Sequence, residues 1–211
     1  MLQARQLTCV REDRTLFESL SFDIAPGDVV QLEGPNGVGK TSLLRILAGL
    51  SQPHAGSVCW QGEEIRHCRD EYHANLLYLG HHTGVKTSLT PYENLSFYQR
   101  MHHPSGQRDL WEVLARVGLA GFEETPCGHL SAGQQRRVAL ARLWLCDEPR
   151  LWILDEPFTA IDRNGVRILE SLFVSHADKG GMVLLTTHQE MALSPERLRR
   201  LSLSDGLRGA A

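Results

Sequence analysis

Short apolar runs alternate with segments of helical periodicity along much of the chain. The strand-like runs are DVVQL (28–32), NLLYLG (75–80), LWILDE (151–156) and GMVLLTTH (181–188), and the helical pattern TSLLRILAGL (41–50) follows the first of them. This alternation predicts an α/β fold, a parallel sheet covered by helices. The unbroken apolar character of LWIL and MVLL is typical of strands that are buried on both faces.

The middle of the chain has a different pattern. Residues 86–144 lack a comparable apolar run, and helical spacing occurs in DLWEVLARVGL (109–119) and at Val138, Ala141 and Leu145. We therefore expect one domain, 1–211, with a helical lobe at about 86–144 inserted into the α/β core. Near the end, RLRRLSLSDGL predicts a short strand and an Asp205-Gly206 turn.

Composition narrows the classes of function. The 211 residues suffice for one core with a smaller lobe, and the net charge of −3 gives no bulk attraction to nucleic acid, so any contact with nucleic acid would need a local patch. No apolar run approaches the roughly 20 residues of a membrane span, and the N-terminus lacks the apolar stretch of a signal peptide. Five cysteines without CxxC spacing indicate free thiols. These features predict a cytoplasmic protein.

The segment GPNGVGKTS fits G-x-x-x-x-G-K-[ST] and lies between a predicted strand and a predicted helix. In such a loop, glycines turn backbone amides toward phosphate oxygens, and the helix N-terminus adds positive potential. Lys40 is expected to reach the β- and γ-phosphates of ATP, and Thr41 to hold Mg²⁺. The predicted nucleotide-binding residues here are Gly34, Pro35, Asn36, Gly37, Val38, Gly39, Lys40, Thr41 and Ser42.

Polar side chains follow three further predicted strands. Asp155 and Glu156 end LWILDE; Asp155 suits the magnesium shell, and Glu156 suits a base that orients the attacking water. His188 ends another strand, and His81 follows Leu76–Leu79. Because open α/β sheets bind ligands at the carboxyl ends of their strands, we expect Glu156, His188 and His81 to lie together at a ligand site, where they are the candidate catalytic residues.

A second helix start lies far from the first in sequence. In LSAGQQRR, Ser131 followed three positions later by Gln134 predicts a capping box, in which the two side chains satisfy free amides of the first turn. A plain capped helix does not need the small residues between them. The function of this second start does not follow from its own pattern.

These motifs together resemble the nucleotide-binding subunits of ATP-binding cassette (ABC) transporters along essentially the whole chain. GPNGVGKT resembles Walker A, LWILDE Walker B, TAID (159–162) the D-loop, TTH the switch-histidine strand, and LSAGQ the signature motif. The resemblance implies a P-loop NTPase core with a mainly parallel sheet, an N-terminal antiparallel β part and an inserted helical subdomain. It also implies that two copies close head to tail, with Ser131, Gly133 and Gln134 binding the nucleotide of the partner copy.

Two positions depart from the family pattern. Where a glutamine usually follows the Leu76–Leu79 strand, this chain offers His81, or His82 under a one-residue shift. A neutral imidazole can accept a hydrogen bond from water, as a glutamine can. The aromatic residue that usually stacks on adenine is replaced by Arg11, which leaves the contact with the base open.

Within the family, GHHTGVKTSLTPYENLSFY and DEPFTAID resemble the ATP-binding subunits of bacterial cytochrome c maturation systems. This implies an ATP- and Mg²⁺-dependent subunit at the cytoplasmic face of the inner membrane, bound to permease subunits, that couples hydrolysis to haem export or to release of a haem-loaded chaperone. CxxCH is absent, and direct haem binding is not expected. The alternatives are another small-substrate ABC exporter, a soluble ABC ATPase acting on ribosomes or DNA, and a small P-loop kinase.

Overall fold

The computed structural model describes residues 1–102, 108–145 and 151–203, so the predicted Asp205-Gly206 turn lies outside the described residues. The strands are β1 (Leu2–Arg11), β2 (Arg14–Ile24), β3 (Val29–Glu33), β4 (Ala55–Trp60), β5 (Glu63–Glu64), β6 (Leu76–Leu79), β7 (Leu151–Asp155), β8 (Met182–Thr186) and β9 (Arg199–Ser202). The helices are α1 (Lys40–Leu47), α2 (Arg69–Ala74), α3 (Pro91–His102), α4 (Leu110–Arg116), α5 (Ala132–Leu140) and α6 (Arg163–Asp178), with 3₁₀ helices η1 (Cys127–His129) and η2 (Ala141–Leu145).

Two sheets form the β structure. The first has the order β6-β7-β8-β3-β9, and every neighbouring pair in it is parallel. The second has the order β2-β1-β4-β5 with antiparallel pairs throughout. The predicted α/β fold, with a parallel sheet and an N-terminal antiparallel part, is confirmed. The strand predicted near the end is β9.

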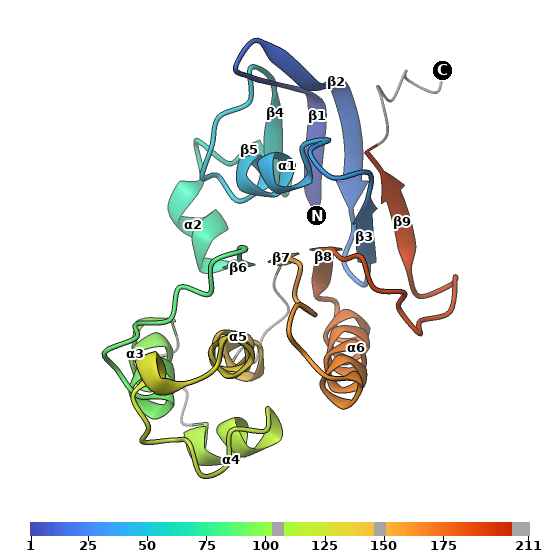
Figure 1. The fold of residues 1–211 in the computed structure, drawn as a ribbon. Coiled ribbons are helices and arrows are strands. Elements are labelled where there is room, and N and C mark those ends of the chain that lie inside the picture. Colours follow the sequence, from blue (N-terminus) through green and yellow to red (C-terminus); the bar gives the residue numbers. More distant parts are fainter. Residues whose placement is uncertain (103–107, 146–150, 204–211) are drawn as a thin grey trace.

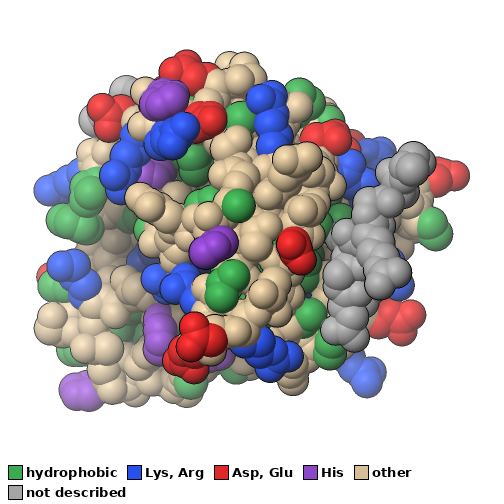
Figure 2. Space-filling view, turned by 90° about the horizontal axis from the view of Figure 1, so that it is seen from above, with side chains coloured by type: hydrophobic (Ala, Val, Ile, Leu, Met, Phe, Trp, Pro, Cys, Tyr) green, Lys and Arg blue, Asp and Glu red, His purple; other side chains and the backbone are tan. Residues whose placement is uncertain are grey.

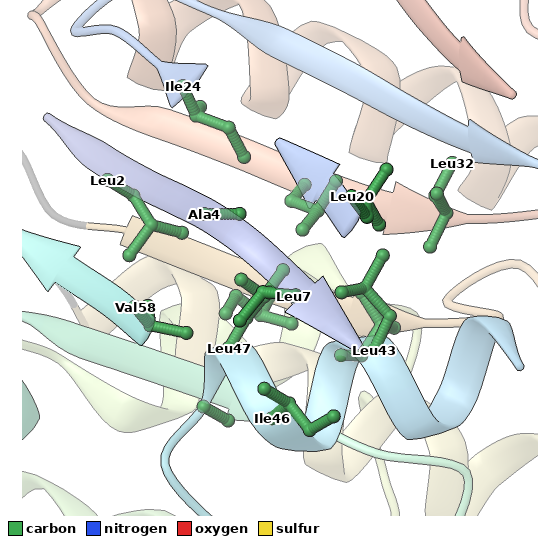
Figure 3. Packing of buried hydrophobic residues seen from close by; sticks show 14 of the residues in the cluster. Leu2, Ala4, Leu7, Leu20, Ile24, Leu32, Leu43, Ile46, Leu47 and Val58 are labelled. Carbon is green, nitrogen blue, oxygen red and sulfur yellow. The ribbon is translucent and has the colours of Figure 1, made fainter. Parts of the chain in front are cut away.

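Helix α1 lies between the two sheets. Its buried residues Leu43, Ile46 and Leu47 belong to one apolar cluster with residues of the antiparallel sheet and with Leu32 of β3. Figure 3 shows these side chains meeting those of β1, β2 and β4 in one layer. Burial of apolar side chains, at about 25 cal/mol per Å², therefore holds α1 at a fixed place against the parallel sheet.

The opposite face of the parallel sheet packs against α6. Along β7, Leu151 and Ile153 belong to the α1 cluster, whereas Trp152 and Leu154 belong to a second cluster that includes Phe173 of α6. This alternation is the two-residue period of a strand with both faces covered. It explains why LWIL and MVLL are apolar at every position.

Helices α3, α4 and α5 lie together on one side of β6 and β7 (Figure 1). They share a third apolar cluster, to which Leu95, Leu114 and Val138 contribute. The helical elements predicted around 109–119 and 138–145 are present, but α5 ends at Leu140 and the chain continues as the 3₁₀ helix η2. The bounds of the lobe, 86–144, remain a prediction.

The register of the sheet aligns the strand ends that matter for function. Leu79 pairs with Leu154, and Asp155 pairs with Thr186, which in turn pairs with Leu32. The segments that follow β6, β7, β8 and β3 therefore leave the sheet at one edge.

On the face shown in Figure 2, acidic and basic side chains are interspersed.

Replacing Phe173 with alanine tests the α6 packing. Phe173 is fully buried, with its ring centroid 6.4 Å from that of Trp152. We expect Phe173→Ala to lower the free energy of unfolding by about 3–5 kcal/mol, measured by urea denaturation. Ile168→Ala on the same helix is the control; Ile168 is 37% exposed, and we expect a change below about 1 kcal/mol. Equal effects of the two changes would contradict the packing described here.

Candidate nucleotide site

The loop between β3 and α1 has the geometry of a phosphate cradle. Gly39 precedes α1 with φ 111°, and a Cβ there would lie 3.0 Å from Cβ of Leu16. Gly34 has φ 149°, and a Cβ there would lie 2.8 Å from the carbonyl oxygen of Leu203. Gly39 provides no side-chain cap for α1, which leaves first-turn amides available to an anion.

Lys40 extends over this loop. Its Nζ donates to the carbonyl oxygens of Gly34 at 2.6 Å and of Pro35 at 3.2 Å. Val38 is buried and belongs to the same apolar cluster as the buried residues of α1. The ammonium group is thus held over the turn where the phosphates are expected, by acceptors that a phosphate oxygen can replace.

Asp155 connects the loop to the sheet. Its carboxylate is buried, and it accepts a hydrogen bond from Thr41 Oγ1 at 2.9 Å and another from Thr186 Oγ1 at 2.8 Å. Thr186 Oγ1 also accepts from the backbone amide of Glu156 at 3.0 Å. These hydrogen bonds form one network that fixes α1, β7 and β8 relative to one another. Burial and the nearby negative charge of Asp155 also raise the pKa of Tyr78.

A cavity of about 300 Å³ brings together many of the predicted residues, although Gly34, Pro35 and Val38 are not among those that line it. It is lined by Leu16, Asn36, Gly37, Gly39, Lys40, Thr41, Ser42, His81, Asp155, Glu156 and His188. Five segments that are far apart in sequence thus line one cavity, four of them at one edge of the parallel sheet and the fifth, with Leu16, from β2. His81 lines the cavity, whereas His82 is not among its lining residues; both are exposed, and their ring centroids lie 5.7 Å apart.

Glu156 and His188 face each other in this cavity. His188 Nε2 lies 3.4 Å from Glu156 Oε1, and the Glu156 side chain is 21% exposed. Glu156 has φ 52°, a left-handed conformation that side chains other than glycine seldom adopt. The backbone at the end of β7 is therefore turned, and the carboxylate projects into the cavity rather than continuing the strand.

The second helix start lies outside this cavity. The predicted capping box is present: Ser131 Oγ accepts from the Gln134 amide at 3.2 Å, and Gln134 Oε1 accepts from the Ser131 amide at 2.8 Å. A Cβ at Gly133 would lie 2.8 Å from the carbonyl oxygen of Ala160. Ala132, the alanine of LSAGQ, is exposed.

Two residues at the site were not anticipated from the pattern. The sequence pattern predicts Thr186 only as part of a strand, yet it contacts both Asp155 and Glu156. Leu16, from β2, lines the cavity, whereas Arg11 is exposed at the end of β1. Both contacts join segments distant in sequence, and a single strand pattern carries no signal for them.

Comparison with known proteins decides the family. The profile described as "ABC transporter" matches residues 17–159, more than half of the chain. The chain belongs to the ABC transporter family. Within this family, a protein of Aliivibrio fischeri named "Cytochrome c biogenesis ATP-binding export protein CcmA" is 55% identical over 97% of this chain and 100% of its own length. A protein of Yersinia pestis with the same name is 58% identical over 97% of this chain and 94% of its own length.

Solved ABC proteins share the fold. The ATP-binding subunit of an ABC transporter superposes with a TM-score of 0.80 at 26% identity, covering 89% of this chain and 79% of that one. A dimeric ATP-binding cassette bound to ADP and Pi superposes with a TM-score of 0.76 at 22% identity, covering 90% of this chain and 88% of that one. In this ABC protein, no helix within 1–102, 108–145 or 151–203 is long and apolar enough to cross a membrane.

Gly133→Ala tests the close approach of the second helix start to the Ala160 segment. Because the new methyl group would meet a backbone carbonyl, we expect a loss of about 1–3 kcal/mol in the free energy of unfolding. Ala132→Gly, at the neighbouring exposed position, should cost less than about 1 kcal/mol. Urea denaturation of both variants checks this. A Gly133→Ala protein as stable as the unmodified chain would show that this contact is looser than described.

Proposed function

We propose that this protein is the ATP-binding and ATP-hydrolysing subunit of an ABC transporter complex for cytochrome c biogenesis. The observation that carries the proposal is the single cavity that joins the Gly34–Ser42 loop to the carboxylates of Asp155 and Glu156. A phosphate cradle and a potential general base on one edge of a sheet are what hydrolysis of a nucleoside triphosphate requires. The names of the 55–58% identical relatives support the biological context.

The loop supplies the binding half of the reaction. The Lys40 ammonium would exchange its carbonyl acceptors for the β- and γ-phosphate oxygens, and the loop amides with Ser42 would surround the remaining oxygens. Oxygen ligands suit Mg²⁺, and the two that converge here are Thr41 Oγ1 and Asp155 Oδ2, 2.9 Å apart. Mg²⁺ bound there would neutralise charge that develops on the phosphates.

The end of β7 supplies the hydrolytic half. The Glu156 carboxylate is positioned to accept a proton from, or to orient, the attacking water. His188, 3.4 Å from it, can hold that carboxylate in place or bond the γ-phosphate. His81 lines the same cavity and would take the role of the family's usual glutamine as a hydrogen-bond acceptor for water.

A second copy of the chain would complete the site. Ser131, Gly133 and Gln134 belong to no wall of their own cavity, and Ser131 is exposed at the start of α5. A head-to-tail dimer would place this helix start over the γ-phosphate of the other copy. An ATP-binding cassette of the same fold is itself dimeric with ADP and Pi bound.

The remaining parts of the proposal concern location and partners. The complex would include integral permease subunits, with this chain on the cytoplasmic face of the bacterial inner membrane. Hydrolysis would drive haem export or release of a haem-loaded chaperone, without direct haem binding by this chain and without nucleic acid. The relatives are named as export proteins of cytochrome c biogenesis, which favours this over another substrate.

Removal of the base should separate binding from hydrolysis. We expect Glu156→Gln to retain ATP binding and to lower the hydrolysis rate by roughly 10²- to 10⁴-fold, about 3 to 5 kcal/mol of barrier. Lys40→Ala is the matched change in the binding half, and it should weaken ATP binding as well as turnover. Phosphate release and nucleotide titration measure the two effects. Hydrolysis at the native rate in Glu156→Gln would exclude Glu156 as the base.

Co-purification tests the transporter context. When the tagged chain is extracted from membranes of its native host, we expect integral membrane subunits to copurify, and a strain lacking the chain to lose c-type cytochromes. Complementation by the unmodified chain should restore them, and Glu156→Gln should not. Normal cytochrome c formation in the deleted strain would sink the assignment to this system, while leaving the ATPase assignment intact.

A further inference from the structure

Arg136 is a buried arginine on the helix that begins with the signature motif. Only 5% of it is exposed, and its neighbours one turn further along the same face of α5 are the buried residues Ala139 and Leu140. An arginine at an apolar position is seldom fully buried unless its donors are satisfied. Its hydrogen-bond partners therefore indicate its function.

The guanidinium donates to three backbone carbonyls. Nη1 lies 3.0 Å from the oxygen of Gly80, and Nη2 lies 2.7 Å from that of Asp155 and 2.9 Å from that of Glu156. Gly80 immediately precedes His81, so the three acceptors mark the ends of β6 and β7 at the nucleotide cavity. The fork shape of the group allows it to reach both strand ends at once, which a lysine ammonium cannot do with the same geometry.

The acceptors are carbonyls and not carboxylates, which distinguishes this contact from an ion pair. Burial lowers the pKa of Arg136 from its usual value, and the charges of Asp155 and Glu156 oppose that effect. What the side chain fixes is the backbone from which Glu156 projects. That backbone has φ 52° at Glu156 and is held on its other side by Thr186, which accepts from the Glu156 amide.

We propose that Arg136 is a positioning residue for the hydrolytic reaction, holding the backbone of Glu156 and of the segment before His81 in their reactive arrangement. The same helix presents Ser131 at its exposed start, so α5 links the surface offered to a second copy with the chain's own general base. A shift of α5 on association would then be transmitted to Glu156 through one guanidinium. This inference rests on the proposed ATP hydrolysis.

Kinetics of Arg136→Lys provide the test. Because the cradle around Lys40 is untouched, we expect kcat to fall by about tenfold or more while KM for ATP changes by less than about threefold. Arg136→Gln, which keeps two donors without the charge, should show the same division between kcat and KM. The control is Arg116→Lys on α4, an exposed residue paired with Glu112, which should leave kcat unchanged.

A second measurement separates positioning from a general structural effect. Residues that act as one unit give non-additive losses, so adding Arg136→Lys to Glu156→Gln should lower the residual rate by less than about threefold. Native kcat in Arg136→Lys, or a fully additive loss in the double variant, would overturn the proposal. Loss of ATP binding in both Arg136 variants would also overturn it. In each case hydrolysis by the unmodified chain still stands as evidence for the proposed function.

Discussion

A buried carboxylate, that of Asp155, is the interaction on which the site depends. A carboxylate removed from water is stable only if its oxygens are hydrogen-bonded, and here each oxygen accepts from one hydroxyl, Thr41 on one side and Thr186 on the other. Hydrogen bonds to a charged group contribute about 1.5–3 kcal/mol each. The need of this one carboxylate for hydrogen-bond donors thus holds the phosphate loop, β7 and β8 in fixed positions relative to one another.

The rest of the architecture supports that arrangement from both faces of the sheet. Helix α1 is fixed by apolar packing between the two sheets, so Thr41, in its first turn, is presented to Asp155 at a set distance. On the other face, α6 packs against Trp152 and Leu154 of β7. The strand that carries Asp155 and Glu156 is consequently rigid, and a rigid support is what a preorganised hydrolytic site needs.

The parts of this site that the sequence predicts are those encoded within a few residues. The glycine loop, the polar ends of the strands and the capping box of Ser131 and Gln134 are local patterns, and the structure contains all three as expected. Contacts made by Thr186 and Leu16 arise from pairing between distant segments and have no local signature. Arg136 does have a local signature. It lies four residues before Leu140 on the buried face of a helix, and an arginine at such a position indicates a buried hydrogen-bond partner.

Under the proposed function, one chain holds only part of a complete hydrolytic site, because the exposed start of α5 lies outside its own nucleotide cavity. The most direct measurement is the mass in solution of Glu156→Gln by sedimentation, with ATP and Mg²⁺ or with ADP. The account predicts twice the 23.6 kDa chain mass with ATP and the single chain mass with ADP. A monomer that binds ATP stoichiometrically and shows no change of mass would contradict it.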